Sequence, residues 1–213
     1  MILYTPIDIP CPAPELDKFE HWFNNNYILD NEYKKHLGEW HDYAAVALRI
    51  NPENWQTSEI IFDWVKQRHY VEGAGLYFNP TFESSFPELV NCIKQMPFKQ
   101  IGAIAAMKQT GEVVEHVDNG CRPEGIEPKR YSVYLTDPKY NTFYVYGNGT
   151  KHYPTFDNDY RCFAFNNFET MHGADAPTGL KIIFIISCMI DEEKHKELIE
   201  RSTSKFADKV IRV

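Results

Sequence analysis

The sequence predicts a mainly β protein of the α+β class, in which a jelly roll of short strands is supported by helices. Two observations lead to this prediction. From residue 100 onward, short apolar segments recur at close spacing and are separated by turn-rich segments such as 118–120, 136–138 and 147–149. Such regular strands and turns are typical of a sandwich or barrel, and two sheets packed as a jelly roll can enclose a ligand cavity at one open end. The first hundred residues instead combine amphipathic segments at helical spacing with isolated strands.

A single domain is expected over residues 1–213. A chain of this length suits one β-rich domain, and neither a linker nor an internal repeat interrupts it. Within the domain we expect a helix-rich support region over 1–99, a β core over 100–190, and a charged helix and tail over 191–213.

In the support region, apolar residues three and four positions apart predict helices that begin near residues 14, 57 and 85. The hydroxyl of Thr57 can cap the second of these helices, and Pro97 ends the third. The apolar run over 43–50 predicts a strand. We interpret the aromatic residues of these segments as core packing.

The β core is expected to contain six strands, which are separated by turn signals. Their predicted ranges are 101–107, 112–118, 130–135, 142–146, 160–166 and 181–189. The charged segment that follows, 192–201, predicts a helix.

Composition narrows the possible partners and the compartment. The net charge of −8 makes a nucleic acid an improbable main partner, because binding a phosphate backbone needs a basic patch. Five scattered cysteines with no Cys-x-x-Cys pair favour reduced thiols in a cytoplasmic protein over a disulfide framework. Neither a secretory leader nor a membrane span is indicated. The oligomeric state is not indicated.

His116, Asp118 and His172 are the candidate metal ligands. Side chains two positions apart on a strand point to the same side, so His116 and Asp118 can reach one ion. His172 follows the apolar run 162–165 and adds a second imidazole. Two histidines and one carboxylate form the facial triad that holds Fe(II) and leaves coordination positions open for reactants.

In these motifs the chain resembles the 2-oxoglutarate/Fe(II)-dependent oxygenases, over about residues 85–190. Its nearest resemblance is to the aspartyl/asparaginyl β-hydroxylase-like and proline-hydroxylase-like branch. The features that carry it are the segment Met96-Pro97-Phe98, the Gly-containing turn Gln109–Glu112 before His-x-Asp, and Arg130 at the start of the next strand. The resemblance implies a double-stranded β-helix, also called a jelly-roll or cupin-like fold.

The resemblance also implies a reaction and a set of site residues. Fe(II) bound by His116, Asp118 and His172 would act with 2-oxoglutarate and O2 to hydroxylate a C–H bond, with release of succinate and CO2. Lys181, which opens the most hydrophobic strand, is the first candidate for pairing with the distal carboxylate of 2-oxoglutarate. Arg130 is the second candidate. The hydroxyl of Tyr134, on the same strand face as Arg130, can add a hydrogen bond, although a packed core tyrosine is an equally good interpretation.

The expected substrate is an amino acid or a peptide or protein side chain, and the loop Asn119–Lys129 is expected to close over the site and set specificity. Two other classes of protein remain open at this point. One is a cupin-like metal protein with isomerase or ligand-sensing activity. The other is a jelly-roll binding module in which the three candidate ligands coincide by chance.

Overall fold

The computed structural model describes residues 1–28, 41–49, 51–56, 76–118, 130–167 and 169–213. Two predictions fall outside these residues, namely the helix that begins near Thr57 and the closing loop Asn119–Lys129. No helix in the described ranges is long and apolar enough to cross a membrane.

The described elements are helices, strands and one short 3-10 turn. The helices are α1 (Leu16–Asn26), α5 (Pro80–Ser85), α6 (Pro87–Lys94) and α7 (Glu192–Lys205), with the 3-10 turn at Pro138–Tyr140. The strands before the core are β1 (Ile2–Pro6), β2 (His41–Leu48) and β3 (Tyr77–Phe78), and the strand after it is β12 (Ile211–Arg212). The core strands are β4 (Phe98–Gln109), β5 (Val113–His116), β6 (Arg130–Tyr134), β7 (Phe143–Gly147), β8 (Thr150–His152), β9 (Cys162–Phe165), β10 (His172–Ala174) and β11 (Lys181–Ile190).

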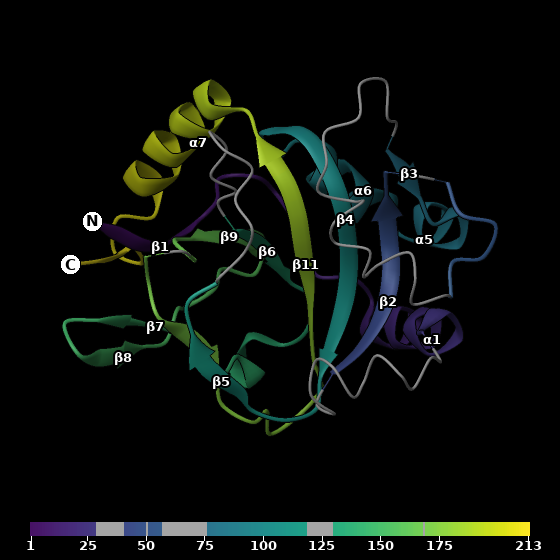
Figure 1. The fold of residues 1–213 in the computed structure, drawn as a ribbon, viewed down its shortest axis with the longest axis horizontal. Coiled ribbons are helices and arrows are strands. Elements are labelled where there is room, and N and C mark those ends of the chain that lie inside the picture. Colours follow the sequence, from purple (N-terminus) through teal and green to yellow (C-terminus); the bar gives the residue numbers. More distant parts are fainter. Residues whose placement is uncertain (29–40, 50, 57–75, 119–129, 168) are drawn as a thin grey trace.

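The strands form two sheets that face each other (Figure 1). The larger sheet has eight strands in the order β12-β1-β9-β6-β11-β4-β2-β3, and the smaller has four in the order β5-β10-β7-β8. Between β4 and β11 the chain passes back and forth between the sheets, and every strand pair is antiparallel. This is the double-stranded β-helix, or jelly roll, that the sequence predicts.

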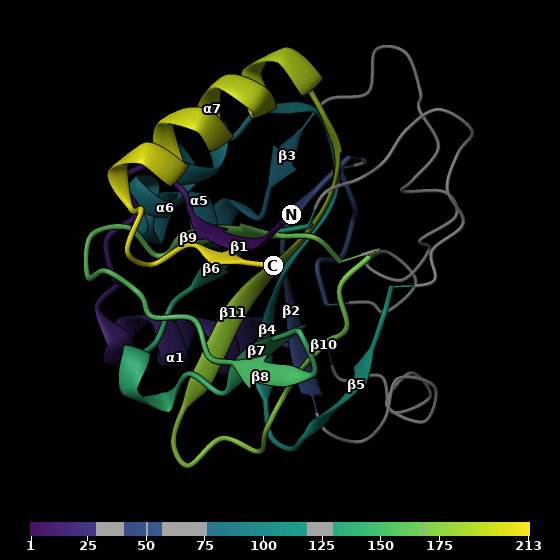
Figure 2. The ribbon, with the colours of Figure 1, turned by 90° about the vertical axis from the view of Figure 1, so that its left-hand side faces the viewer.

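The helices cover the outer face of the larger sheet, away from the smaller one (Figure 2). Phe19 and Trp22 of α1 and Phe82 of α5 pack there against Phe184 of β11 and its neighbours. Two of the helices begin at a capping side chain: that of Asn79 accepts a hydrogen bond from the backbone of Thr81 at the start of α5, and that of Asp191 accepts one from the backbone of Lys194 at the start of α7. This helical layer supports the long strands β4 and β11 on the outer face of the larger sheet.

The inner face of the larger sheet is ordered by strand register. Lys181 of β11 lies opposite Gln109 of β4, which lies opposite His41 of β2. Because side chains alternate along a strand, every second residue from this row onward faces the smaller sheet. The inner face of β4 therefore carries Ala103, Ala105, Met107 and Gln109.

The predicted core strands are present, with shifts of a few residues at their ends. The structure adds the short strands β1, β3, β8, β10 and β12, which the sequence analysis did not predict. The prediction for 192–201 is also met, by α7. The four cysteines in the described ranges are free thiols, and their positions are Cys11, Cys92, Cys162 and Cys188.

Candidate active site

His116, Asp118 and His172 converge on one point between the sheets. Their ligand atoms all lie within 4.8 Å of one another. His116 Nε2 is 3.3 Å from Asp118 Oδ1, and His172 Nε2 is 3.7 Å from the same oxygen. His116 ends β5 and pairs with His172 at the start of β10, so strand pairing brings the distal histidine to the His-x-Asp motif.

Each histidine presents Nε2 to this point because its other ring nitrogen is held by the backbone. His116 Nδ1 lies 2.8 Å from the carbonyl oxygen of Val114, and His172 Nδ1 lies 3.0 Å from that of Thr170. A carbonyl oxygen only accepts, so Nδ1–H is the donor in the neutral ring and the lone pair is on Nε2. This is the arrangement that orients metal-binding imidazoles.

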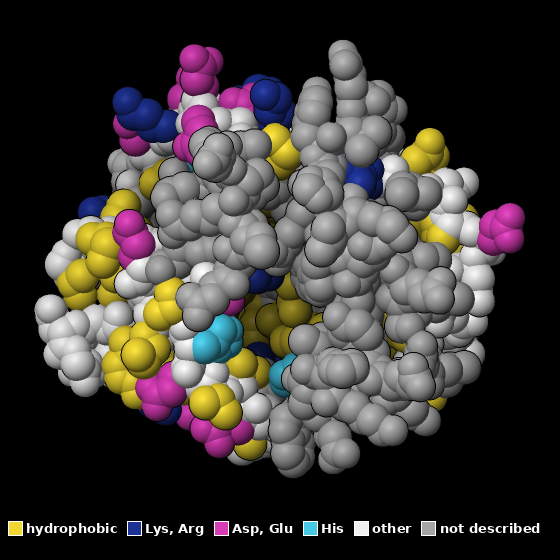
Figure 3. Space-filling model, in the orientation of Figure 1, with side chains coloured by type: hydrophobic (Ala, Val, Ile, Leu, Met, Phe, Trp, Pro, Cys, Tyr) yellow, Lys and Arg dark blue, Asp and Glu magenta, His cyan; other side chains and the backbone are white. Residues whose placement is uncertain are grey.

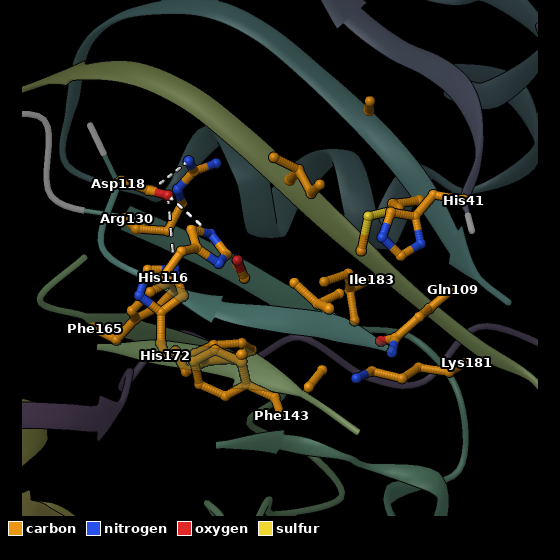
Figure 4. Close-up of a pocket in the computed structure, with 18 of the residues that line it drawn as sticks. His41, Gln109, His116, Asp118, Arg130, Phe143, Phe165, His172, Lys181 and Ile183 are labelled. Atoms are coloured by element: carbon orange, nitrogen blue, oxygen red, sulfur yellow. Dashed lines mark hydrogen bonds and ion pairs between the residues drawn. The ribbon is translucent and has the colours of Figure 1, made fainter. Parts of the chain in front are cut away.

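Asp118 is held in the same way, with one oxygen occupied and the other free for an ion. Its Oδ2 accepts hydrogen bonds from Arg130 Nη2 at 2.8 Å and from Asn167 Nδ2 at 2.7 Å. The Asp118 backbone N–H donates to the carbonyl of Asn167 at 2.9 Å. Oδ1 is thereby left facing the two imidazoles (Figure 4).

The protonation of the three groups follows from their surroundings. Burial opposes ionisation of Asp118, but contact with the His116 ring, which donates to the carboxylate in its protonated form, and the charge of Arg130 outweigh burial and hold the pKa of this carboxyl well below its usual range. The hydrogen bond to Asp118 raises the pKa of His116. Burial lowers the pKa of His172, which favours its neutral form.

These donors fit a divalent transition metal. Ligand atoms at right angles around an ion, with bonds of about 2.1 Å, lie about 3 Å apart, close to the separations of the Nε2 and Oδ1 atoms. Two imidazoles and one carboxylate on one side of the ion suit Fe(II) and leave the opposite side open. Any further group bound on this open side of the ion would lie in the cavity between the sheets.

The cavity has a volume of about 330 Å³, within the range of small-molecule sites. It forms the hollow in the centre of Figure 3, where histidine side chains are visible at its rim. The three candidate ligands lie at one end, and Lys181 and Gln109 lie at the other (Figure 4). The wall between them is largely apolar.

Lys181 is a buried cation without a carboxylate partner in the described part of the chain. Its side chain is 1% exposed, and Nζ donates a 2.8 Å hydrogen bond to Thr142 Oγ1. Burial lowers the pKa of Lys181 to about 7, although the charge of Asp175 acts in the opposite direction. Burying an ammonium is costly unless an anion compensates it. This end of the cavity is therefore suited to a ligand carboxylate.

Of the other two predicted cofactor-binding residues, Arg130 lines the cavity and Tyr134 does not. Arg130 pairs with Asp118, so its guanidinium lies beside the candidate metal ligands. Tyr134 is fully buried, and its ring stacks on Phe156 at 4.8 Å in the core between the sheets. Tyr134 is therefore a packed core tyrosine, which was the second of its two interpretations from the sequence.

Asn167 and Thr142 are site residues that the sequence analysis missed. Asn167 is 49 residues from its partner Asp118, and Thr142 is 39 residues from Lys181. Neither belongs to a motif. The only available signal was their position beside core strands, because Asn167 follows β9 and Thr142 precedes β7.

Replacing Asn167 with alanine is expected to weaken metal binding by about 10- to 100-fold, the usual effect of removing a group that orients a ligand. The variant removes a hydrogen bond to Asp118 Oδ2 and leaves the three ligands in place. The measurement is a competition titration with Mn(II) or Fe(II). Asn166→Ala, which removes an amide that bonds to Glu169 instead, is the matched control. Equal affinities in the two variants would contradict the role assigned to Asn167.

Comparison with known proteins supplies no family for this chain: no family model matches it, and no curated protein matches it. Among solved structures it is similar to a prolyl hydroxylase in complex with a hypoxia inducible factor oxygen degradation domain peptide fragment, from Trichoplax adhaerens. The TM-score is 0.45 and the sequence identity 8%, over 85% of this chain and 78% of that one. At this level of similarity the function has to be argued from the site itself.

Proposed function

We propose that the protein is a 2-oxoglutarate- and Fe(II)-dependent oxygenase that hydroxylates a C–H bond of an amino acid or of a peptide or protein side chain. One observation carries this proposal. A facial set of two imidazoles and one carboxylate shares a mostly apolar cavity with a buried lysine that has no carboxylate partner among the described residues. The first feature fits Fe(II), and the second fits the far end of a dicarboxylate.

Different residues would bind the ion and the cosubstrate. His116, Asp118 and His172 would hold the ion, and Lys181 with Thr142 would hold the distal carboxylate of 2-oxoglutarate. Bound Fe(II) supplies the chemistry by which 2-oxoglutarate, O2 and R–H become succinate, CO2 and R–OH. The chain supplies orientation and exclusion of water, to which the apolar wall contributes.

Arg130 fits the role of a positioning residue for Asp118. Its guanidinium occupies Oδ2 of that carboxylate, which leaves Oδ1 for the ion. It remains the second candidate for a carboxylate of the cosubstrate or substrate, because one of its five N–H donors is used in this contact.

The proposal is tested by metal and cosubstrate preference. The protein is expected to bind Fe(II), or Mn(II) as a redox-inert substitute, together with 2-oxoglutarate, and to release succinate when a substrate panel is screened. A cupin-like protein with isomerase or ligand-sensing activity, the alternative class, would bind a divalent metal and ignore 2-oxoglutarate. Failure to bind 2-oxoglutarate in the metal-loaded protein would therefore favour that alternative.

Binding of 2-oxoglutarate is expected to weaken as the pH rises above about 7. In the protein without ligand, the pKa of the Lys181 amine is about 7 because it is buried. It donates to Thr142, Gln109 lies opposite it across the strands with His41 beyond, and the charge of Asp175 acts on it. A carboxylate stabilises the ammonium form, so binding above pH 7 takes up about one proton, and affinity falls by up to about tenfold per pH unit.

Calorimetry in two buffers of different ionisation enthalpy measures this proton uptake. Lys181→Arg is the matched variant, because a guanidinium stays protonated across the range and should give a flat profile. A wild-type profile as flat as that of the arginine variant would contradict the role of Lys181.

A further inference from the structure

The smaller sheet carries both candidate histidine ligands, but no helical layer supports it. Its histidine-bearing strands are short, with four residues in β5 and three in β10. The described helices lie against the larger sheet, so none of them covers the outer face of the smaller one (Figure 2). Short strands depend on side-chain pairs across the sheet for their stability. The outer face of the smaller sheet therefore needs packing of its own.

Tyrosine side chains provide this packing. The ring centroid of Tyr144 lies 5.7 Å from that of Tyr146 and 5.8 Å from that of Tyr153, in edge-to-face contacts. Lys151 Nζ lies 3.9 Å from the centre of the Tyr144 ring and is itself paired with Asp175 at 3.2 Å. As a result, Tyr144 is only 1% exposed although it lies on the outer face of the sheet.

Beneath the Tyr144 ring lies Gly173, the residue that follows His172. The two residues are directly opposite each other in the pairing of β7 with β10. A methyl group at position 173 would lie 2.6 Å from the Tyr144 hydroxyl oxygen and 2.8 Å from both the ring carbon Cζ and the backbone carbonyl oxygen of Val113. Nonbonded carbon atoms pack at about 3.5–4.0 Å, so no side chain fits there. Gly173 does not have a positive φ, so glycine is needed for space and not for backbone conformation.

Tyr144 therefore contacts the region where the two histidine-bearing strands meet. Gly173 follows His172 on β10, and Val113 lies on β5 three residues before His116. Because the Tyr144 hydroxyl and the Val113 carbonyl are both close to one point above Gly173, the ring from β7 lies over β10 and ends next to β5. On the inner face of the same junction, the rings of His116 and His172 are 4.5 Å apart.

We propose that Tyr144 is a positioning residue for the candidate metal site. By packing on Gly173 from the outer face, it fixes the spacing of β5 and β10 and so the separation of His116 and His172. Ligand distances in metal sites lie within about 0.2 Å of their standard values, so a small shift between these strands changes both affinity and coordination geometry. This inference rests on the metal site of the proposed function and adds a residue that is not among the described lining residues of the cavity.

The test uses Co(II) alone, as a spectroscopic substitute for Fe(II). Tyr144→Ala is expected to weaken Co(II) binding by about tenfold, the lower end of the effect of removing a group that orients a ligand. It should also change the visible absorption bands of bound Co(II), which report coordination geometry. Tyr144→Phe keeps the ring on Gly173 and should restore both the affinity and the spectrum. If the alanine variant does not fold, Tyr144→Leu, whose side chain is too short to reach β5, replaces it.

Phe82→Leu is the control for loss of stability alone. Phe82 is fully buried in the helical layer, where its ring lies 5.8 Å from that of Phe184 on the larger sheet. The smaller side chain leaves a cavity in the core, so the melting temperature of the metal-free protein should fall. The affinity for Co(II) and the spectrum of the bound ion should stay as in the wild type.

The outcomes separate this inference from the proposed function. Absence of Co(II) binding by the wild-type protein would count against the metal site and so against the oxygenase proposal. If the wild type binds Co(II), an unchanged affinity and spectrum in Tyr144→Ala would overturn the positioning role and leave the oxygenase proposal in place. Equal losses of affinity in Tyr144→Ala and Phe82→Leu, or no rescue by Tyr144→Phe, would also overturn it.

Discussion

His172→Ala is expected to abolish stoichiometric metal binding while the protein remains folded. The substitution removes one of three ligands, and the remaining pair, His116 and Asp118, cannot enclose an ion on its own. Sites with incomplete ligand sets lose most of their affinity, because affinity depends on ligand number and geometry. Elemental analysis after dialysis against Fe(II) or Mn(II) measures the loss, and circular dichroism checks the fold.

His21→Ala is the matched control for this experiment. His21 lies on the exposed side of α1, where its ring contacts Asn25, and it is not among the cavity residues. The control should bind one ion per chain, as the wild type is expected to do. Retention of a full equivalent of metal by a folded His172→Ala protein would contradict the proposed metal site.

Lys181→Met is expected to weaken 2-oxoglutarate binding by roughly 30- to 1000-fold, which corresponds to about 2–4 kcal/mol for breaking a buried charge pair. Methionine keeps the length of the side chain and removes the charge that would face the ligand carboxylate. The free protein should be no less stable, since an apolar side chain replaces a buried amine. Titration of the Mn(II)-loaded protein with 2-oxoglutarate measures the effect.

Lys139→Met is the control for general loss of positive charge. The Lys139 side chain is 63% exposed and pairs with Asp137 at the surface. An unchanged affinity in Lys181→Met would instead assign the anchoring role to Arg130, and Arg130→Met would then show the larger loss.

The sequence predicted the long core strands because their side-chain pattern is local. β4 and β11 contain enough apolar residues to be recognised without their partners. β10 consists of His-Gly-Ala, a composition with low strand preference, and it is a strand because β5 and β7 pair with it on both sides. Such strands are determined by tertiary pairing, so the sequence alone could not reveal them.

The same distinction applies to the candidate site, where the local motif could be predicted and the long-range contacts could not. The His-x-Asp motif could be predicted because two residues of one strand define it. The orienting contact from Asn167 and the hydrogen bond from Lys181 to Thr142 join segments far apart in the chain. No spacing rule connects these pairs, because only the packing of the two sheets brings them together.

The two halves of the proposed site belong to different sheets. His116 and His172 lie on the smaller sheet, whereas Lys181 lies on the larger one. The distance between the proposed metal site and Lys181 therefore depends on the side chains that separate the two sheets. Phe143 of the smaller sheet separates them by packing on Phe163 and Phe165 of the larger sheet, with ring centroids 5.5 and 4.9 Å apart. We expect these phenylalanines to act as a spacer that sets the length of the dicarboxylate that the site accepts. Thinning it, as in Phe163→Leu, should shift preference among dicarboxylates of different chain length without touching a ligand atom.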